Sequence, residues 1–316
     1  MILPWFYSGL GLLMLLLAGD LLVKGAVNLS LRLGVPALIV SLTIVAFGTS
    51  APELLVAIKA TLNDSPGIAL GNVVGSNIAN ILLVLGIPAL LARMHTSECD
   101  TRKSFLIMIG ASVLFIALAW RGMLGLGAGL ILLGALALVL ADNVWEVRCH
   151  RKNGQDDELE EIEEADPDMP YWRIGLYLVL GLIGLPMGAS LLVDSAEEIA
   201  RAYGVSDTVI GLTLVAVGTS LPELATTVMA ALRRQADVAL GNVIGSNMFN
   251  LLAILGIASL FGPIRVDPEF LEFDLWVMLG SALLMIPFVF FRRDITWQWG
   301  LFLTALYVAY VAAILF

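Results

Sequence analysis

Residues 48–87 read GTSAPELLVAIKATLNDSPGIALGNVVGSNIANILLVLGI, and residues 218–257 read GTSLPELATTVMAALRRQADVALGNVIGSNMFNLLAILGI. The two stretches align without a gap at an offset of 170 residues, and 21 of the 40 aligned positions are identical. The identities include Gly, Thr, Ser, Pro, Glu and Asn, whereas chance likeness between two apolar helices would give scattered matches of Leu and Val. The chain therefore consists of two related halves.

The composition around this repeat is that of a polytopic membrane protein. Of the 316 residues, 59% are hydrophobic and 14% are charged, and the net charge is −10. Soluble domains average about 45–50% apolar and about 25% charged residues. The composition therefore excludes a soluble enzyme and a disordered chain, and the acidic balance excludes a nucleic-acid-binding protein. Apolar runs of 17–25 residues, without alternation, favour membrane-spanning helices over a β-barrel.

The apolar runs predict five helices in each half, the first over 5–23 and the sixth over 173–193. We expect a first five-helix repeat over 1–147, an acidic linker over 148–172 and a second five-helix repeat over 173–316. Because five is an odd number, the second half must enter the membrane from the opposite side. The predicted fold is thus an all-α polytopic membrane protein whose ten transmembrane helices form two inverted repeats. Inverted repeats are typical of secondary transporters, which bind substrate near the membrane midplane.

The distribution of Lys and Arg predicts the orientation of these helices. With the N-terminus outside, 13 of these residues fall on the cytoplasmic side and 4 on the outer side. Positive residues gather on the cytoplasmic side of membrane proteins, so both termini are expected outside and the acidic linker in the cytoplasm. The two cysteines, Cys99 and Cys149, then lie on the cytoplasmic side, where free thiols are expected.

Two glutamates, Glu53 and Glu223, lie inside apolar helices at matching positions of the repeat. A carboxylate within the membrane is costly and therefore indicates a functional site. Ser50 and Ser220 precede these glutamates by three residues, so each Ser shares a helix face with its Glu. Pro52 lacks an N–H group and frees backbone carbonyls beside Glu53. Carboxylates, hydroxyls and carbonyls are hard oxygen ligands that suit Ca2+ and Na+.

The partner helices carry the motifs GNVVGSNIAN and GNVIGSNMFN. The amides of Asn72 and Asn242 in these motifs either join helices or bind ions, and the sequence leaves both roles open. The glycines allow close helix packing. Each motif also carries a Ser and an Asn four residues apart on one helix face. These candidates are Ser76, Asn80, Ser246 and Asn250.

The two intramembrane glutamates supply a charge of −2, which balances one Ca2+ or two Na+. Competition of the two ions for one pair of carboxylates is the simplest rule that couples their movements. An empty, dry site would leave two buried charges unpaired, which is strongly unfavourable. The sequence therefore favours exchange of one ion for another over transport of a single ion.

The motif pairs GTSAPE with GNVVGSNIAN and GTSLPE with GNVIGSNMFN resemble the two α-repeats of the cation/calcium exchanger superfamily. The resemblance is greatest to the prokaryotic sodium/calcium exchanger branch and covers essentially the whole chain. It implies Na+-driven Ca2+ transport by alternating access, through ion sites clustered at the membrane midplane. It also implies that the first and sixth helices slide across the core, and that the protein lies in a prokaryotic inner (plasma) membrane.

The resemblance implies a set of oxygen ligands at the positions of this chain that match the motifs of the superfamily. One position departs from the pattern, because archetypal members have Asp where this chain has Asn250. We expect Asn250 to bind the ion through its amide oxygen, without adding charge. The other implied ligands are Glu53, Glu223, Ser50, Ser220, Ser76, Ser246, Asn80 and the backbone carbonyls of Thr49 and Thr219.

The main alternative is a K+-dependent or H+-driven antiporter of the same superfamily. An intramembrane hydrolase would need a base beside Ser50 or Ser220, but the only histidines, His95 and His150, are expected in loops. A channel is disfavoured because a compact polar cluster binds ions rather than providing a path of several sites. We predict no enzyme activity, no cofactor and no nucleic-acid partner. The predicted partners are Ca2+, Na+ and the lipid bilayer, and the sequence predicts no oligomeric state.

Overall fold

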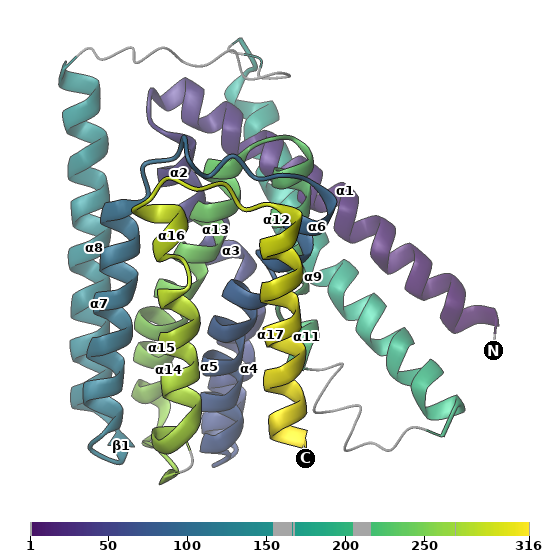
Figure 1. The fold of residues 1–316 in the computed structure, drawn as a ribbon, viewed down its shortest axis with the longest axis vertical. Coiled ribbons are helices and arrows are strands. Elements are labelled where there is room, and N and C mark those ends of the chain that lie inside the picture. Colours follow the sequence, from purple (N-terminus) through teal and green to yellow (C-terminus); the bar gives the residue numbers. More distant parts are fainter. Residues whose placement is uncertain (1, 154–165, 167, 205–215, 269, 316) are drawn as a thin grey trace.

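The structure is a computed structural model, and it describes residues 2–153, 166, 168–204, 216–268 and 270–315. Long helices dominate it (Figure 1). The first half contains α1 (Ile2–Leu33), α2 (Ala37–Val40), the π-helix η1 (Ser41–Val45), α3 (Ala46–Thr49), α4 (Ala51–Leu62), α5 (Pro66–Leu82), α6 (Gly86–Leu91), α7 (Arg102–Ala119), β1 (Met123–Leu124) and α8 (Leu126–Asn153).

The second half begins with the sixth predicted helix. It contains α9 (Tyr171–Ala202), α11 (Ala216–Gly218), α12 (Leu221–Leu232), α13 (Ala236–Phe249), the π-helix η3 (Asn250–Ile254), α14 (Leu255–Phe261), β2 (Ile264–Arg265), the π-helix η4 (Phe270–Asp274), α15 (Leu275–Leu283), α16 (Ile286–Val289) and α17 (Trp297–Leu315). The strand of the second half follows α14, whereas that of the first half follows α7. The all-α class is therefore confirmed, apart from two strands of two residues each in the described part of the chain.

Eight helices in the described part of the chain are long and apolar enough to cross a membrane. A ninth candidate span is a helix pair, Ala37–Thr49 and Ala51–Leu62, bent by 44° at its break. The matching span of the second half is predicted over 206–232, and its first ten residues lie outside the described residues. The described residues thus give eight or nine candidate spans, and the expected ten helices in inverted repeats stay a prediction.

The repeat in the sequence reappears in the element boundaries. α4 and α12 begin and end 170 residues apart, and α5 and α13 also begin 170 residues apart. Short antiparallel pairings then connect each half to the other. β1 of the first half pairs with β2 of the second, and Met94 forms a β-bridge with Ile295. β1 lies at the lower end of the molecule in Figure 1, whereas the α6–α7 and α16–α17 connections run over the upper end.

α1 and α9 are longer than the sequence analysis predicts. α1 continues for ten residues beyond the predicted end at residue 23, and α9 for nine residues beyond residue 193. The prediction is wrong because it ended each helix with its apolar run, whereas the polar residues that follow remain helical. The ion pair between Lys24 and Asp20, 3.2 Å apart and one turn from each other, stabilises this extension. Each helix is followed by a glycine with positive φ, Gly34 or Gly204.

α1 and α9 cross each other closely on one side of the molecule (Figure 1). Glycines permit this contact: a Cβ atom at Gly181 would lie 2.7 Å from Cβ of Leu22, and one at Gly11 would lie 2.7 Å from the backbone nitrogen of Leu192. The pair covers a core in which α5–α6 and α13–α14 are the most deeply buried spans. These buried spans carry the GNVVGSNIAN and GNVIGSNMFN motifs.

Candidate cation site

Helix breaks position the two buried glutamates. Ser50 separates α3 from α4 with φ −82° and ψ 6°, and Ser220 precedes α12 with φ −87° and ψ 4°. A proline follows within two residues of each break. Glu53 and Glu223 consequently lie in the first turns of α4 and α12, where the helix dipole favours negative charge. Each glutamate is only 1% exposed, so both carboxyl groups are inside the protein.

The two halves meet directly at one of these acids. Ser50 Oγ of the first half donates a hydrogen bond to Glu223 Oε1 of the second half at 3.2 Å. Residues from both copies of the GTS-x-PE motif therefore belong to one polar cluster. The sequence analysis expected this meeting at the interface of the repeats.

Asn72 and Asn242 connect the halves in matching ways. Asn72 Nδ2 donates to the backbone oxygen of Glu53 at 3.3 Å, and Asn242 Nδ2 donates to that of Glu223 at 3.2 Å. The Asn72 carbonyl oxygen accepts from Thr219 Oγ1 at 3.4 Å, and that of Asn242 accepts from Thr49 Oγ1 at 3.3 Å. Both amide groups are used in these contacts, which favours the helix-joining role for Asn72 and Asn242.

A second matching pair holds the amides of Asn80 and Asn250. Asn80 Nδ2 donates to Asn247 Oδ1 at 3.0 Å, and Asn250 Nδ2 donates to Asn77 Oδ1 at 3.2 Å. Because the nitrogen of each amide is fixed across the repeat interface, its carbonyl oxygen is directed elsewhere. Asn77 and Asn247 were not among the predicted site residues. Their signal was present in the sequence, since both occupy the same place in the Gly-Ser-Asn of each motif.

Several buried oxygens of this cluster have no hydrogen-bond partner within the described part of the chain. Buried polar atoms are normally paired, so a set of unpaired oxygens carried by helices that contact one another indicates a ligand. A cation would satisfy these atoms as a group, because all of them are oxygens. They are Glu53 Oε2, Glu223 Oε2, Ser220 Oγ, Ser246 Oγ, Asn80 Oδ1 and Asn250 Oδ1.

The backbone widens next to both Asn residues. η3 begins at Asn250, and in the first half the Val84 N–H group donates to the carbonyl of Ala79, five residues back, at 2.9 Å. Such π-type turns are frequent at functional sites. The widening follows the Ser and Asn of each motif, so it lies at equivalent places in the two halves.

The remaining predicted ligands divide into two groups. Ser76 is 3% exposed and belongs to buried α5. Thr49 and Thr219 are held through their hydroxyl groups, which donate to Asn242 and Asn72. The ligand role expected for the Thr49 and Thr219 backbone carbonyls stays a prediction, as does ion binding by each of the other predicted residues.

The chemistry of the cluster suits a transported hard cation. The described residues contain no group of three or more His, Cys, Asp or Glu side chains that could hold a metal ion. The cluster has two carboxylates, and its other candidate ligands are neutral hydroxyl and amide oxygens. Oxygen donors suit Na+ and Ca2+, and the number of charged ligands tunes how tightly Ca2+ is held.

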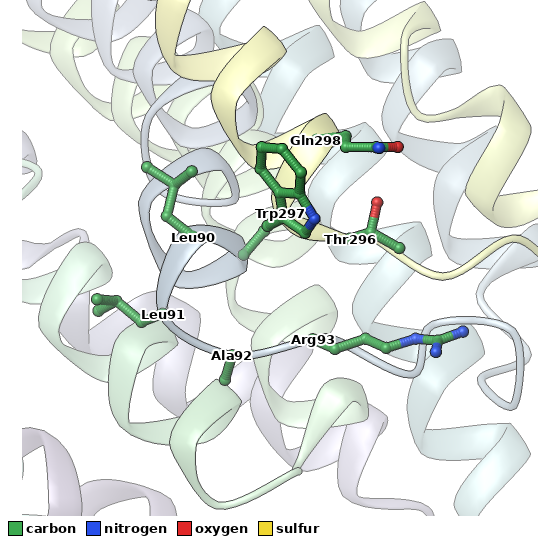
Figure 2. Close-up of a pocket in the computed structure, with 8 residues that line it drawn as sticks. Leu90, Leu91, Ala92, Arg93, Thr296, Trp297 and Gln298 are labelled. Carbon is green, nitrogen blue, oxygen red and sulfur yellow. The ribbon is translucent and has the colours of Figure 1, made fainter.

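A separate surface pocket of about 410 Å3 lies between the end of α6 and the start of α17 (Figure 2). Leu90, Leu91, Arg93 and Trp297 are among the residues that line it, and it includes none of the predicted ion ligands. Its position makes it part of the surface rather than of the cation site.

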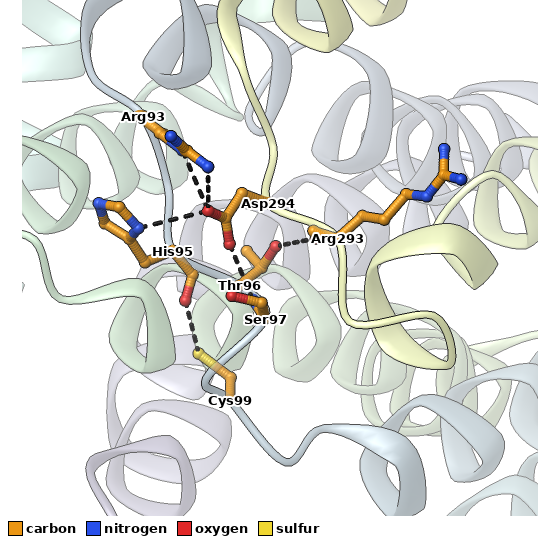
Figure 3. Close-up of polar contacts among 7 residues, drawn as sticks. All are labelled: Arg93, His95, Thr96, Ser97, Cys99, Arg293 and Asp294. Carbon is orange, nitrogen blue, oxygen red and sulfur yellow. Dashed lines mark hydrogen bonds and ion pairs between the residues drawn. The ribbon is translucent and has the colours of Figure 1, made fainter.

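Next to this pocket, Asp294 joins the α6–α7 and α16–α17 connections (Figure 3). Arg93 Nη2 lies 2.8 Å from Asp294 Oδ2, and the Ser97 N–H group donates to Asp294 Oδ1 at 3.2 Å. Burial opposes ionisation of Asp294, but hydrogen bonds from Ser97 and Arg93, with the positive charge of Arg93, hold its pKa below the ordinary value. His95 Nδ1 lies 3.4 Å from the same carboxylate. These contacts connect the second half, through Asp294, to the first half at one end of the molecule.

Comparison with known proteins agrees with this architecture. The family profile described as "Sodium/calcium exchanger protein" matches residues 3–145 and 174–316. The chain belongs to the sodium/calcium exchanger family. The two matched segments coincide with the two halves of the chain and leave out the acidic linker.

Individual relatives are similar to this chain over most of their length. Sodium/calcium exchanger MaX1 of Methanosarcina acetivorans is 35% identical, and the match covers 97% of each chain. Inner membrane protein YrbG of Escherichia coli is 36% identical, over 85% of this chain and 83% of that protein. The solved structure of the sodium-calcium exchanger NCX_Mj soaked with zero Na+ and Ca2+ superposes with a TM-score of 0.82, at 32% identity over 99% of each chain.

Membership of the exchanger family confirms several predictions from the sequence. The chain is a membrane protein of a family of ion antiporters, and its relatives are transporters rather than enzymes. The family and the NCX_Mj fold support antiport of Ca2+ against another cation.

Proposed function

We propose that the protein exchanges Na+ for Ca2+ across the membrane by alternating access. The observation that carries this proposal is the set of unpaired buried oxygens contributed by both halves around Glu53 and Glu223. The names of its relatives and of NCX_Mj support the choice of ions. No cofactor enters this proposal, because the ions are the transported substrates.

The charge of the site supports coupling between the two ions. Glu53 and Glu223 balance one Ca2+ or two Na+, so either load leaves the site electrically neutral. An ion-free site would leave two carboxylates buried without a counter-charge, which is strongly unfavourable. The proposed ligands are these two glutamates with Ser50, Ser220, Ser76, Ser246, Asn80, Asn250 and the carbonyls of Thr49 and Thr219.

We further propose that residues 1–147 and 173–316 form two inverted five-helix repeats joined by the cytoplasmic linker 148–172, with both termini outside. Three observations support this topology: the 170-residue offset of the helix boundaries, the cross-pairing of each half with the other at opposite ends, and the excess of Lys and Arg on one side. An inner-membrane location agrees with the name of the relative YrbG.

The two halves differ in conformation, as alternating access requires. Within the described residues, α1 packs along α12 of the core in addition to α9, whereas α9 has only small contacts with α3, α11 and α12 in addition to α1. We propose that movement of α1 and α9 across the core exchanges these two arrangements. The NCX_Mj structures concern extracellular ion exchange, and the similarity to them supports an outward-facing state for this structure.

The experiment that tests the function measures Ca2+ uptake into proteoliposomes under imposed Na+, K+ or H+ gradients. We expect uptake driven by an outward Na+ gradient, without a requirement for K+. The Glu53→Gln variant should lose this uptake, while Glu197→Gln, which removes an acid paired with Arg201 in α9, should retain it. Uptake that needs K+, or that follows a proton gradient without Na+, would replace Na+/Ca2+ exchange by one of the alternative antiporters.

A further inference from the structure

We infer that the ion pair between Asp20 and Arg233 stabilises the present arrangement of α1 on the core and so biases the transport cycle toward this state. This inference rests on the proposed alternating access. Asp20 lies within α1, and Arg233 follows the last residue of α12. Nε and Nη2 of Arg233 both contact Asp20 Oδ1, and Lys24 Nζ lies 3.2 Å from Asp20 Oδ2.

The environment of this pair makes it stronger than a typical surface contact. The side chains of Asp20 and Arg233 are 19% and 22% exposed, so much of the water around them has been removed. Opposite charges attract more strongly in such partly buried surroundings than on the open surface. Gly19 of α1 also packs closely against α12, since a Cβ atom at Gly19 would lie 3.0 Å from the Ala225 carbonyl oxygen. This contact helps to keep Asp20 beside Arg233.

The other half does not carry this pair. At the 170-residue offset, Arg233 corresponds to Asn63, Asp20 to Ser190 and Lys24 to Asp194. The backbone is similar at the two turns, because Arg234 and its counterpart Asp64 both have positive φ, at 56° and 52°. The mirror positions therefore have similar geometry but no cation: Ser190 Oγ donates to Asp194 Oδ2 at 3.2 Å instead.

This difference has a consequence for the transport cycle. Sliding α1 by one helical turn, about 5.4 Å, would carry Asp20 out of reach of Arg233. In the mirror arrangement α9 would approach α4 as α1 now approaches α12, but Asn63 and Ser190 could not form an equivalent ion pair. The two states then differ in free energy, although their ion ligands are duplicated. The ion pair between Asp20 and Arg233 therefore favours the state in which it is formed, which is the state of the present structure.

The test measures apparent Ca2+ affinity separately on the two sides of the membrane, in proteoliposomes whose orientation is fixed by labelling. The apparent dissociation constant on one side rises as the state open to that side becomes less populated. Asp20→Asn and Arg233→Gln should therefore weaken apparent Ca2+ affinity outside and strengthen it inside, by about threefold or more. Arg233→Lys, which keeps the charge, should stay close to wild type.

A matched variant installs the pair on the other half. Ser190→Asp combined with Asn63→Arg should shift the two apparent affinities in the opposite directions from Asp20→Asn. A merely structural defect would weaken affinity on both sides together. The inference would be overturned if Asp20→Asn and Arg233→Gln weakened apparent Ca2+ affinity on both sides. It would also be overturned if both affinities stayed unchanged in variants that still exchange ions. Because Arg233 lies in a turn, Arg233→Gln provides the test even if Asp20→Asn fails to fold.

A distance measurement separates this inference from the proposed function. Spin labels at Leu17 of α1 and Leu232 of α12, which are 57% and 52% exposed, report the position of α1 on the core, with Cys99 and Cys149 replaced by Ser. Asp20→Asn should increase a second distance population. An unchanged distribution overturns the role of the pair, even in a protein that exchanges no ions. Loss of all exchange by the wild-type protein would instead contradict the proposed function.

Discussion

The two halves of this membrane protein have matching asparagine contacts at the candidate cation site and differ away from it, although Ser50 donates to Glu223 while Ser220 Oγ has no partner within the described residues. At the site, Asn72 and Asn242 make equivalent contacts with Glu53 and Glu223, and the hydroxyl of a Thr in the opposite half completes each contact. Away from it, α1 is tied to the core by an ion pair that α9 does not have at the matching residues. The ion chemistry is thus duplicated, whereas the contacts that hold each conformation are not.

The same contrast appears at the two ends of the core. Beside the Met94–Ile295 bridge, Asp294 forms an ion pair with Arg93. At the 170-residue offset, Asp294 corresponds to Leu124 and Arg93 to Pro263, so the β1–β2 pairing has no equivalent ion pair at these two positions. Substitutions at matching positions should therefore have equal effects inside the site and unequal effects outside it.

The largest expected effect comes from the two acids. Glu53→Gln and Glu223→Gln should each reduce Na+-driven Ca2+ flux at least about 100-fold, since one ligand and half of the site's charge are lost. The flux is measured in proteoliposomes, with size-exclusion elution as a control for folding. An effect confined to one acid would show that the halves do not share the site equally.

The next effect concerns the amides that orient Asn80 and Asn250. Asn247→Ala and Asn77→Ala should each weaken apparent Ca2+ affinity by about tenfold, because each removes the acceptor that holds the opposite Asn amide. Apparent affinity is read from Ca2+-dependent flux. Asn77 Nδ2 also donates to Met278 Sδ at 3.7 Å, and Asn247 Nδ2 donates to the Asn77 backbone oxygen at 3.3 Å, so the comparison shows whether these different contacts make the two positions unequal. Wild-type affinity in both variants would remove these residues from any role at the site.

A smaller effect is expected where α1 crosses α9. Gly181→Ala places a Cβ atom 2.7 Å from Leu22 Cβ and should slow exchange several-fold by obstructing the helix crossing. Gly175→Ala in the same helix is the matched control, since a Cβ atom there meets nothing within 4 Å. Initial rates at saturating Ca2+ are the measurement. Equal rates in the two variants would contradict a role for close α1–α9 packing in the transport cycle.

The smallest effect belongs to the Asp294 cluster. Asp294→Asn should lower the melting temperature of the purified protein by about 1–3 °C at neutral pH, because an ion pair whose cation, Arg93, is largely exposed contributes little. The pKa of Asp294 is depressed in the folded protein, so its contribution is present at neutral pH and lost as the pH falls through that depressed value. Wild-type and variant melting temperatures should converge on acidification. A gap that persists at acidic pH would mean that Asp294 acts through shape rather than charge.

The sequence alone indicated many of the buried oxygen-bearing residues of the candidate site because these residues repeat, and their role as ion ligands stays a prediction. Glu53 and Glu223 stand out as acids in apolar helices, and the Ser and Asn four residues apart in each motif follow from helical periodicity. The contacts of Asn77 and Asn247 could not be predicted, since they form between helices far apart in the chain. The ends of α1 and α9 were missed because hydropathy marks where the apolar run stops and not where the helix does.

The pair of Asp20 and Arg233 illustrates the same limit. The two residues are separated by more than 200 positions, and only the crossing of α1 over α12 brings them together. A repeat in sequence identifies what the halves have in common. What a difference between the halves does, such as Arg233 in place of Asn63, can be inferred only from the contacts that the residue makes in the structure.

The central claim is that both halves build one cation site, and Ca2+ binding stoichiometry tests it most directly. Equilibrium binding to the purified protein, by isothermal titration calorimetry or radioactive Ca2+, should give one Ca2+ per chain that Na+ displaces competitively. Either Glu53→Gln or Glu223→Gln alone should abolish this binding. Two Ca2+ per chain, with one retained in each single variant, would mean that each half holds its own ion and would contradict the shared site.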